Sequence, residues 1–574
     1  MERHKTLGAL LLLPALLALT PSGQGGSIPG AAGRHGPERA PSGMVVSEHW
    51  LASEAGRDVL AAGGNAVDAA IATGLALAVT HPAAGNIGGG GFMVIRFPNG
   101  TSTAIDFREK APLAAHPEMW LDENGEYSSD VHHNSHRAVG VPGTVAGFEK
   151  AHRLYGSAAW VDLVEPSVVL AEEGFLVTEG LAEGLSYLVE RKGSGYPATV
   201  AAFSKDGAPY QAGDLLRQPD LARTLGRIRD EGAAGFYHGE TARLVAEEMR
   251  ANGGLITEED LDLYQARERT PVRGTYRGYE IVSMPPPSSG GVALVTMLNI
   301  LEGYDVAAMG HNSAPYVHHL AEAMRRAFRD RATYLADQDF VDVPVHTLIT
   351  KEHAGSLRET IDPARASTSA PSDLAQGYES PETTHYSVVD ADGMAVSVTY
   401  TLEAGYGAGI VVPGAGFLLN NEMGDFNAGP GLTTDRGLIG TDPNLARPQQ
   451  RMLSSMTPSI VAKDGELVAV VGSPGGRTII NTVLQVILNV VDFGMDIQEA
   501  VDAPRVHHQW LPDRIRIEEE GVEASTVAEL EAMGHPVDMG GRQGLAHSIM
   551  IDPATGERLG AADPRNPDSG ARGH

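Results

Sequence analysis

The sequence predicts a globular α/β protein, built from more than one domain or from one large multilayer domain. The chain has 574 residues, which is long for a single small core. Its hydrophobic content of 42% is enough to form a sizeable core. Helix and strand patterns alternate from the start of the expected folded part, between Met44 and His81.

The charge balance is strongly acidic. Lys and Arg number 43 against 73 for Asp and Glu, which gives a formal net charge of −30. Such a surface repels phosphate backbones, so we do not expect a nucleic acid as a partner and assign the acidity to solubility. The chain has no cysteine, which excludes disulfides, thiolate catalysis and lipid-modified cysteine.

The N-terminus predicts an export signal over residues 1–26. A basic start precedes an apolar run from Leu7 to Leu19, which is short for a membrane span and typical of a signal-peptide core. The alternative is a buried N-terminal helix. Residues 27–43 are rich in Gly, Pro and Arg and predict a disordered tail. We therefore expect an exported bacterial protein, periplasmic or secreted, with no membrane span after signal removal.

The first expected elements surround a glycine-rich turn. Small apolar residues line every side of the segment from Asn65 to Val79, which predicts a buried, tightly packed helix. A glycine run at 85–91 could cradle a phosphate, but a strand pattern at 93–97 follows it instead of a helix. We therefore predict a tight turn and no nucleotide site.

The middle of the chain predicts further strands and helices. A strand at 104–109 ends in charge at Arg108, where a lone arginine is usually part of a surface ion pair. A strand at 279–283 and a proline-rich turn precede a helix at 292–301. The segment from Tyr316 to Tyr334 predicts an amphipathic helix with Arg/Asp pairs on its solvent face.

Histidine pairs give no sign of a metal site. His132-His133 and His318-His319 are adjacent pairs, and adjacent side chains point apart on a helix or a strand. The sequence contains no H-E-x-x-H motif and no cysteine ligand. We expect neither a metal nor another cofactor.

A linker and a β-hairpin follow. Residues 367–382 are rich in Ser, Pro and Asp and predict an exposed flexible linker. Two strand patterns, 385–390 and 394–401, are joined by Ala391-Asp392-Gly393, a strong hairpin signal. A three-residue loop places Thr383 opposite Thr401, and a two-residue loop offsets the pair by one.

Thr383 stands where the linker meets the first strand. Cutting the bond between Glu382 and Thr383 would give Thr383 a free α-amine beside its own hydroxyl, which combines a nucleophile and its base on one residue. Two facing threonines are also explained by ordinary β-propensity. The threonines alone therefore leave both interpretations open.

Three polar groups follow the hairpin in the chain. Glu422 and Asp425 lie three residues apart among asparagines, and Ser454-Ser455 precede a proline-led strand. Gly475-Gly476 open a helix, where exposed backbone N–H groups suit an oxyanion hole. A tight turn explains the two glycines equally well.

These residues closely resemble the γ-glutamyltranspeptidase family. The resemblance covers nearly everything after residue 44, in order and with similar spacing. The matching segments are DFRE (106–109), MPPPSSGG (284–291), TTHYSVVD (383–390), YTLE (400–403), NNEMGDF (420–426), LSSMTP (453–458) and GSPGG (472–476).

The resemblance implies an N-terminal nucleophile hydrolase with a four-layer α/β/β/α sandwich. Such a precursor cuts itself in two, which here implies a large chain at 44–382 and a small catalytic chain at 383–574, forming a heterodimer. The substrates implied are glutathione and other γ-glutamyl compounds, with water, an amino acid or a dipeptide as acceptor. Thr383 would form a γ-glutamyl ester and then pass the acyl group on.

The resemblance also implies roles for individual residues. Thr401 would orient Thr383, and the Gly475 and Gly476 amides would form the oxyanion hole. Arg108 would hold the substrate α-carboxylate. The chemistry agrees, because a zwitterionic head needs a cation and carboxylates, and arginine binds a carboxylate through two hydrogen bonds. The remaining implied contacts are Glu422 and Asp425 with the α-ammonium, and Ser454 and Ser455 with the α-carboxylate.

Two positions depart from the commonest family pattern. Family members carry Asn or Glu at the position of Glu403, next to the α-amino site. Glutamate there resembles bacterial members that act on longer γ-glutamyl chains or mainly hydrolyse. Residues 429–447 resemble a lid loop, with Arg436 where relatives often have Tyr.

Other functions remain as alternatives. A related acylase acting on glutaryl-type side chains, or a poly-γ-glutamate hydrolase, would keep the same catalytic threonine. A periplasmic peptide-binding protein belongs to a different class and would also be exported and acidic. It would have no use for a threonine directly after a flexible linker.

Overall fold

Two seven-stranded antiparallel sheets form the centre of the protein. The structure is a computed structural model that describes residues 36–370, 383–432, 441–519 and 521–574. The predicted signal peptide, Glu382 and Arg436 lie outside these residues. One sheet has the order β1 (Glu38–Ala40), β20 (Arg558–Ala561), β19 (Ser548–Ile551), β15 (Glu466–Val471), β14 (Ser459–Lys463), β11 (Tyr279–Ser283) and β10 (Val272–Tyr276). The other has the order β21 (Gly570–Gly573), β2 (Met44–Ser47), β12 (Thr384–Val389), β13 (Ala395–Thr401), β3 (Gly90–Arg96), β4 (Ser102–Phe107) and β9 (Arg267–Arg269).

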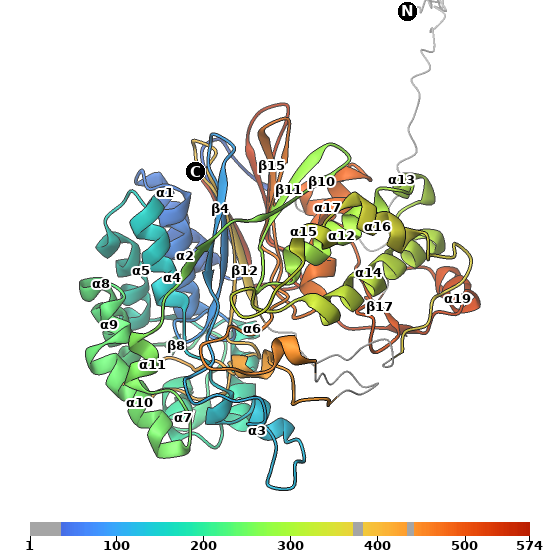
Figure 1. The fold of residues 1–574 in the computed structure, drawn as a ribbon. Coiled ribbons are helices and arrows are strands. Elements are labelled where there is room, and N and C mark those ends of the chain that lie inside the picture. The colour runs from blue at the N-terminus through green and yellow to red at the C-terminus, as the bar shows by residue number, and fades with distance from the viewer. Residues whose placement is uncertain (1–35, 371–382, 433–440, 520) are drawn as a thin grey trace, which may run out of the picture. The chain divides into compact units, whose positions relative to one another are not determined.

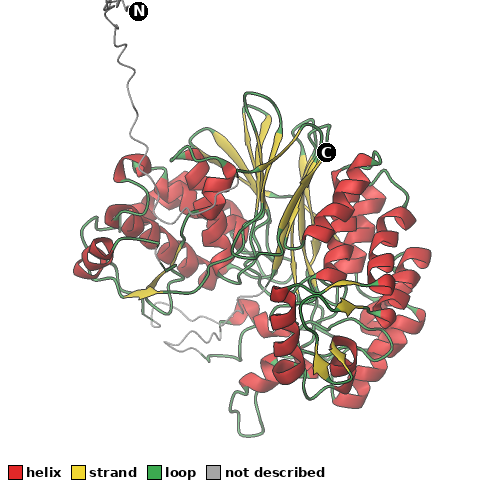
Figure 2. Ribbon diagram, turned by 180° about the vertical axis from the view of Figure 1, so that it is seen from behind, coloured by secondary structure: helices red, strands yellow, loops and turns green. Residues whose placement is uncertain are grey.

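Helices cover the outer face of each sheet, so the residues from 36 onward form four layers. On one side, α1 (Trp50–Ala61), α2 (Ala66–Thr80), α4 (Thr144–Tyr155) and α5 (Trp160–Glu173) stand beside the sheet that contains β12 (Figure 1). On the other side stand α12 (Gly290–Leu301), α14 (Ala314–Tyr334) and α17 (Thr478–Val491). Seen from behind, the strands again lie between two groups of helices (Figure 2). The predicted α/β/β/α sandwich is confirmed.

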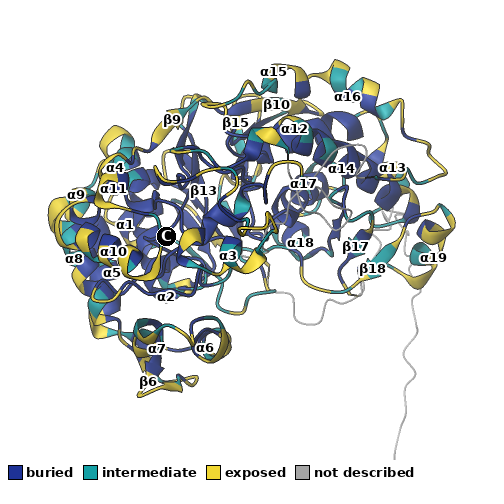
Figure 3. Ribbon diagram, turned by 60° about the horizontal axis from the view of Figure 1, so that its bottom comes forward, coloured by how far each residue is buried: buried dark blue, intermediate teal, exposed yellow. Residues whose placement is uncertain are grey.

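Apolar side chains fill the space between the layers. Residues such as Phe92, Val282 and Ile460 form a buried cluster shared by the two sheets. Each sheet is also joined to its own helices by a larger apolar cluster. In Figure 3 the strands and the inner helices are mostly dark blue, whereas exposed residues gather on the outer helices and loops. Burial on both faces explains why the central strands are nearly continuous apolar runs.

Helix α2 has the burial that its composition predicts. Every residue from Ala66 to Thr80 is buried. The helix begins with a capping box, in which Asn65 accepts from the backbone of Asp68 and the Asp68 side chain accepts from the Asn65 backbone. Small side chains let α2 pack closely against both its sheet and neighbouring helices.

The prediction of a solvent-exposed face on α14 is wrong. Arg325, Arg326 and Arg331 are at most 5% exposed, although each carries a charge. Glu322 of the same helix accepts from Arg326 over 2.6 Å and from Arg325 over 3.2 Å. Internal ion pairs and hydrogen bonds therefore let charged residues face the interior, which a periodicity argument cannot detect.

The prediction of a disordered tail at 27–43 is wrong for its C-terminal residues. Residues 38–40 form strand β1, which pairs antiparallel with β20. Arg39 forms ion pairs with Asp552 and Glu557, and Ala40 is buried. A Gly/Pro-rich stretch can still add a short edge strand when a partner strand offers its hydrogen bonds. Within the described ranges, no helix has the length and apolar character needed to cross a membrane.

The hairpin has the register of the three-residue loop. Thr384 pairs with Tyr400 and Val389 pairs with Ala395, and the Asp390 amide donates to the Met394 carbonyl over 3.1 Å. Extending this register by one residue sets Thr383 opposite Thr401. Strands β12 and β13 lie in the middle of their sheet, between β2 and β3. Thr383 therefore directly precedes a central strand that pairs with β13 along its whole length.

Candidate active site

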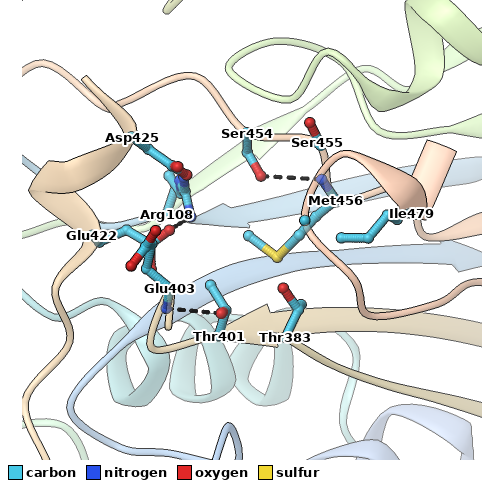
Figure 4. Close-up of a pocket in the computed structure, with 11 residues that line it drawn as sticks. Arg108, Thr383, Thr401, Glu403, Glu422, Asp425, Ser454, Ser455, Met456 and Ile479 are labelled. Atoms are coloured by element: carbon cyan, nitrogen blue, oxygen red, sulfur yellow. Dashed lines mark hydrogen bonds and ion pairs between the residues drawn. The ribbon is translucent and has the colours of Figure 1, made fainter. Parts of the chain in front are cut away.

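One pocket collects most of the candidate residues. It is lined by Arg108, Thr383, Thr401, Glu403, Glu422, Asp425, Ser454, Ser455 and Gly476, together with Met456 and Ile479 (Figure 4). These residues come from the end of β4, the β12–β13 hairpin, three later loops and the start of α17, so only the tertiary fold brings them together. Gly475 lines a neighbouring cavity that also reaches Thr383.

Thr383 and Thr401 form the floor of the pocket at the end of the hairpin. Thr383 is 6% exposed and Thr401 is 3% exposed. The Thr401 hydroxyl oxygen accepts from the Glu403 amide over 2.9 Å, as Figure 4 shows. Glu403 has φ of +79°, a conformation that non-glycine residues adopt only when the surroundings hold them there. This turn directs the Glu403 side chain into the same pocket.

Arg108 is buried and is not the surface residue that its position after a strand suggests. It directly follows β4 and is 1% exposed. Its guanidinium donates to Glu422 through Nη1 and to Asp425 through Nη2. Nε and Nη2 also lie 3.3 Å from the carbonyl oxygens of Met452 and Leu453. These contacts fix the planar fork toward the pocket.

Burial shifts the protonation of this cluster. Burial by itself lowers the pKa of Arg108, but Glu422 and Asp425 more than offset it, so the pKa of Arg108 rises above its ordinary value. Burial raises the pKa of Glu109 to about 8 despite the opposing charge of Arg108. Burial likewise raises the pKa of Glu422 well above its ordinary value. A cation bound beside these carboxyl groups would favour their ionised form and so lower their pKa values again.

Asparagines hold the turn that carries Glu422 and Asp425. This turn is the 3₁₀ segment η4 (Glu422–Asp425). The Asn420 side chain accepts from the Glu422 amide over 3.0 Å and donates to the carbonyls of Gly88 and Gly140 over 2.8 Å each. Both carboxylates therefore sit on a backbone that is tied to the turn before β3.

The proline-rich turn supports the two serines. The Ser454 amide donates to the Pro287 carbonyl over 3.0 Å, and the Ser289 amide donates to the Ser454 carbonyl over 2.7 Å. Arg331 of α14 donates to the hydroxyl oxygens of Ser289 and Ser455, over 2.9 Å and 3.1 Å. Arg331 thereby links the helical layer to the pocket wall.

The backbone conformation favours glycine at both positions of the oxyanion-hole pair, and a close contact also excludes a side chain at Gly475. Gly475 and Gly476 have φ of +127° and +55° and lead into α17. A Cβ at Gly475 would lie 2.4 Å from Thr478 Oγ1. The Thr478 amide and hydroxyl both donate to the Gly475 carbonyl, over 3.1 Å and 2.7 Å. The turn therefore has no room for a side chain at Gly475.

The structure adds residues that the sequence argument left without a role. Glu109 is fully buried beside Arg108, and neither of its carboxylate oxygens has a hydrogen-bond partner within the described part of the chain. Its position next to Arg108 in the segment DFRE (106–109) is the sequence feature that could have indicated a role for it. Asn420 stands in the matching segment at 420–426, whereas Arg331 gave no signal, because its partners are distant in the chain.

A histidine group away from the pocket has metal-like spacing. One ligand atom from each of His318, Glu322 and His535 lies within 4.8 Å of the others. However, His318 Nδ1 and His535 Nε2 share a hydrogen bond of 2.7 Å. Both Glu322 oxygens accept from arginines and from Ser367. His318, Glu322 and one nitrogen of His535 already take part in these hydrogen bonds, so the group gives no reason to infer an ion.

Comparison with known proteins assigns the fold and the sequence to one group. The family model described as gamma-glutamyltranspeptidase matches residues 52–573. The chain is 49% identical over 541 residues to the glutathione hydrolase proenzyme of Escherichia coli, covering 94% of this chain and 93% of that relative.

Two solved structures extend the comparison. The cephalosporin acylase of Bacillus halodurans superposes with a TM-score of 0.84 and 27% identity, over 96% of this chain and 98% of that one. The γ-glutamyltranspeptidase of Helicobacter pylori is 48% identical with a TM-score of 0.55, over 56% of this chain and 91% of that one. The long family match and the high identity to the E. coli relative decide the assignment. The chain belongs to the γ-glutamyltranspeptidase family.

Proposed function

We propose that this protein is a γ-glutamyltransferase and glutathione hydrolase that activates itself by cutting its own chain before Thr383. One observation supports this most directly. A threonine at the start of a central strand shares a pocket with Arg108, Glu422 and Asp425. The pocket thus combines a nucleophile with binding groups for an amino-acid head.

The charges of the pocket fit the α-amino acid end of a γ-glutamyl group. Arg108 and the hydroxyls of Ser454 and Ser455 offer donors to the α-carboxylate. Glu422 and Asp425 offer acceptors to the α-ammonium. In the structure these carboxylates pair with Arg108. A bound zwitterion would replace these pairs by pairing its carboxylate with Arg108 and its ammonium with Glu422 and Asp425. This exchange limits the cost of desolvating the charges.

The chemistry follows from a free amine on Thr383. The α-amine, with an ordinary pKa of about 7.7–8.0, accepts the hydroxyl proton as Oγ attacks the γ-amide carbon. The Gly475 and Gly476 amides stabilise the oxyanion. The amine then passes the proton to the leaving nitrogen, and the C–N bond breaks. A γ-glutamyl ester on Thr383 remains, which water hydrolyses or an amine acceptor takes up.

Maturation uses the same hydroxyl on the chain itself. Thr383 Oγ attacks the carbonyl carbon of Glu382, its proton passes to the Thr383 nitrogen as the peptide C–N bond breaks, and an ester links Glu382 to Thr383. Water then hydrolyses this ester and leaves residues 44–382 and 383–574 as two chains of one heterodimer. Because the amine is bound in a peptide before this step, the uncut protein has no free base for γ-glutamyl transfer.

An exported location accompanies this function in our proposal. The basic start and the apolar run at Leu7–Leu19 support a signal peptide, and the absence of cysteine suits an oxidising compartment. We assign the mature protein to the periplasm or the medium.

The likeness to a cephalosporin acylase makes an acylase the second candidate. A glutaryl-type acyl group has a carboxylate but no ammonium. It would leave Glu422 and Asp425 without a cation other than Arg108. The pocket therefore favours a γ-glutamyl donor over a glutaryl donor.

A gel and a chromogenic assay test the proposal. Wild-type protein should run as two bands and release nitroaniline from γ-glutamyl-p-nitroanilide. Thr383→Ala should remain one band without activity, and Thr383→Ser should keep both functions at a lower rate. Uncut, inactive wild-type protein would contradict the proposal. Faster turnover of a glutaryl anilide would favour the acylase.

A further inference from the structure

Two walls of the pocket are joined behind it by the side chain of Asn444. One wall is the η4 turn that ends at Asp425, and the other runs from Leu453 into Ser454 (Figure 4). Asn444 Nδ2 donates to the Asp425 carbonyl over 2.7 Å, and the Leu453 amide donates to Asn444 Oδ1 over 2.9 Å. One side-chain amide therefore ties the two walls together.

Asn444 is buried behind these walls and does not line the pocket itself. It ends the 3₁₀ segment η5 (Asp442–Asn444) and is 5% exposed. Its backbone is held as well, because the Asn427 amide donates to the Asn444 carbonyl over 2.8 Å. Both polar ends of its side chain are paired, so Asn444 can fix the position of other groups without contacting a substrate.

Arg108 joins the same two residues from inside the pocket. Its Nη2 donates to the Asp425 carboxylate and lies 3.3 Å from the Leu453 carbonyl oxygen. Four residues thus form a closed ring of hydrogen bonds, with Arg108 on the substrate side and Asn444 on the other. The separation of the two walls is therefore fixed by two independent bridges.

Substrate binding would remove one of these bridges. In the exchange of ion pairs proposed above, the substrate α-carboxylate takes over Arg108, and the Asp425 carboxylate turns to the α-ammonium. The contact between Arg108 and Asp425 is then given up. The contact from Asn444 to the Asp425 carbonyl involves neither Arg108 nor the substrate. Asn444 therefore keeps the Asp425 backbone beside the carboxylate-binding wall after Arg108 has changed partners.

A neutral amide suits this position. Asparagine offers a donor to one backbone carbonyl and an acceptor to one backbone amide within a single rigid group. An aspartate could accept from the Leu453 amide but could not donate to the Asp425 carbonyl. A cationic side chain would compete with the α-ammonium for Glu422 and Asp425. The amide therefore joins the walls without adding a charge to the buried cluster.

We infer that Asn444 is a positioning residue that sets the spacing between the carboxylate-binding and ammonium-binding walls, and with it the selectivity of the pocket for an α-amino acid head. The inference rests on the proposed function and deepens it. An α-amino acid carries its carboxylate and its ammonium on one carbon, so both walls must keep one separation to bind it. A ligand without the ammonium needs only one wall and is less sensitive to that spacing.

Two inhibitors that differ only in the ammonium separate this role from a general loss of structure. L-Glutamate carries the α-ammonium and glutarate lacks it, and both are measured as competitive inhibitors of γ-glutamyl-p-nitroanilide cleavage. In Asn444→Ala we expect Ki for glutamate and KM for the anilide to rise about tenfold, whereas Ki for glutarate should change less than about threefold. The kcat should fall less than about threefold, because Asn444 does not contact the reacting atoms.

Two further variants serve as controls. Asn299→Ala removes another buried amide, which is 3% exposed, lies in α12 and donates to the Ile349 carbonyl over 2.8 Å. Asn299 does not line the pocket, so the ratio of the two Ki values should stay as in the wild type. Asn444→Ser keeps a hydroxyl that can donate or accept, so it should lose less than Asn444→Ala.

Each outcome is decisive. Equal changes in both Ki values, no change in either, or a loss confined to kcat would overturn the inference. Two bands on a gel show that a variant has folded and matured. If neither Asn444 variant matures, Asn444 acts on the fold as a whole and the inference is also overturned. Wild-type protein that does not cleave γ-glutamyl-p-nitroanilide would instead overturn the proposed function.

Discussion

Arg108 donates to Glu422, a residue 314 positions later in the chain, and both side chains are at most 1% exposed. This buried pair joins the end of β4 to the η4 turn. The same guanidinium also donates to Asp425. Because two carboxylates already hold the Arg108 guanidinium in place, it can exchange one of these acceptors for a substrate carboxylate without reorienting.

The fork geometry predicts a strong effect of Arg108→Lys. Lysine keeps the charge but cannot make two parallel hydrogen bonds, so kcat/KM for γ-glutamyl-p-nitroanilide should fall about a hundredfold. Self-cleavage should persist, because the chain around Glu382–Thr383 needs no free amino-acid head. Steady-state kinetics and a denaturing gel measure the two effects. The matched change Arg243→Lys, at an exposed helix position, should alter neither. Loss of cleavage in Arg108→Lys would show a structural role.

Glu109 predicts a pH dependence of stability. Burial raises its pKa from 4.5 to about 8, so the folded state keeps a proton that the unfolded state loses. This contribution is complete below pH 4.5 and is lost as the pH rises to about 8, at no more than about 1.4 kcal/mol per pH unit. Glu109→Gln is neutral at every pH. Its free energy of unfolding should therefore fall less between pH 5 and pH 8 than that of the parent.

Single-chain Thr383→Ala protein is the suitable background for that measurement, because cleavage would otherwise add chain dissociation to unfolding. Denaturant titrations at several pH values compare how the free energy of unfolding changes with pH in the two proteins. Parallel slopes for the parent and the Glu109→Gln variant would mean that Glu109 is ionised in the folded state. Glu248→Gln, which changes a carboxylate outside the pocket, controls for charge alone.

Arg331 predicts an effect on substrate binding through Ser455. It donates to the Ser455 hydroxyl oxygen and holds Ser289 behind it. Arg331→Met should raise KM for the γ-glutamyl donor several-fold and reduce kcat less, because the residue positions a binding group and does not contact the acyl carbon. Arg329→Met, two positions away and 43% exposed, is the matched control. An equal loss in both variants, or a loss confined to kcat, would contradict this role.

Gly475 predicts a steric requirement next to the nucleophile. Gly475→Ala places a methyl group 2.4 Å from Thr478 Oγ1 at a φ of +127°. The loop must shift, so activity should fall at least tenfold and stability by about 1 kcal/mol or more. Gly226→Ala, in helix α8 (Pro219–Glu231) with open space around it, should be neutral or slightly stabilising. Full activity in Gly475→Ala would exclude a close approach of this loop to the reacting atoms.

Local patterns predicted much of the fold near Thr383. The Asp-Gly turn and the alternating strands predicted the β12–β13 hairpin, and its loop length set Thr383 opposite Thr401. The small residues of α2 predicted its complete burial. These predictions succeed because a short turn and a side-chain periodicity constrain neighbouring residues directly.

Predictions from local sequence patterns were wrong for charged residues that are buried beside partners from distant parts of the chain. The sequence of α14 suggested a solvent face, but Glu322 and the arginines of that helix satisfy each other inside the protein. Arg108 looked like a surface residue after a strand, although its partners come from residues 422–453. Charged residues cannot be placed inside or outside until their partners are known.

The sequence by itself determined the family motifs, the position of Thr383 at the start of a strand and most of the candidate residues for the pocket. Only the tertiary structure decided that Arg108 lies buried between two carboxylates, that Glu109 is buried beside it, and that Asn444 joins Asp425 to Leu453 behind the pocket. Motifs record which residues occur, whereas burial and the pairing of charges depend on segments that are hundreds of residues apart and are brought together by the packing of the two sheets.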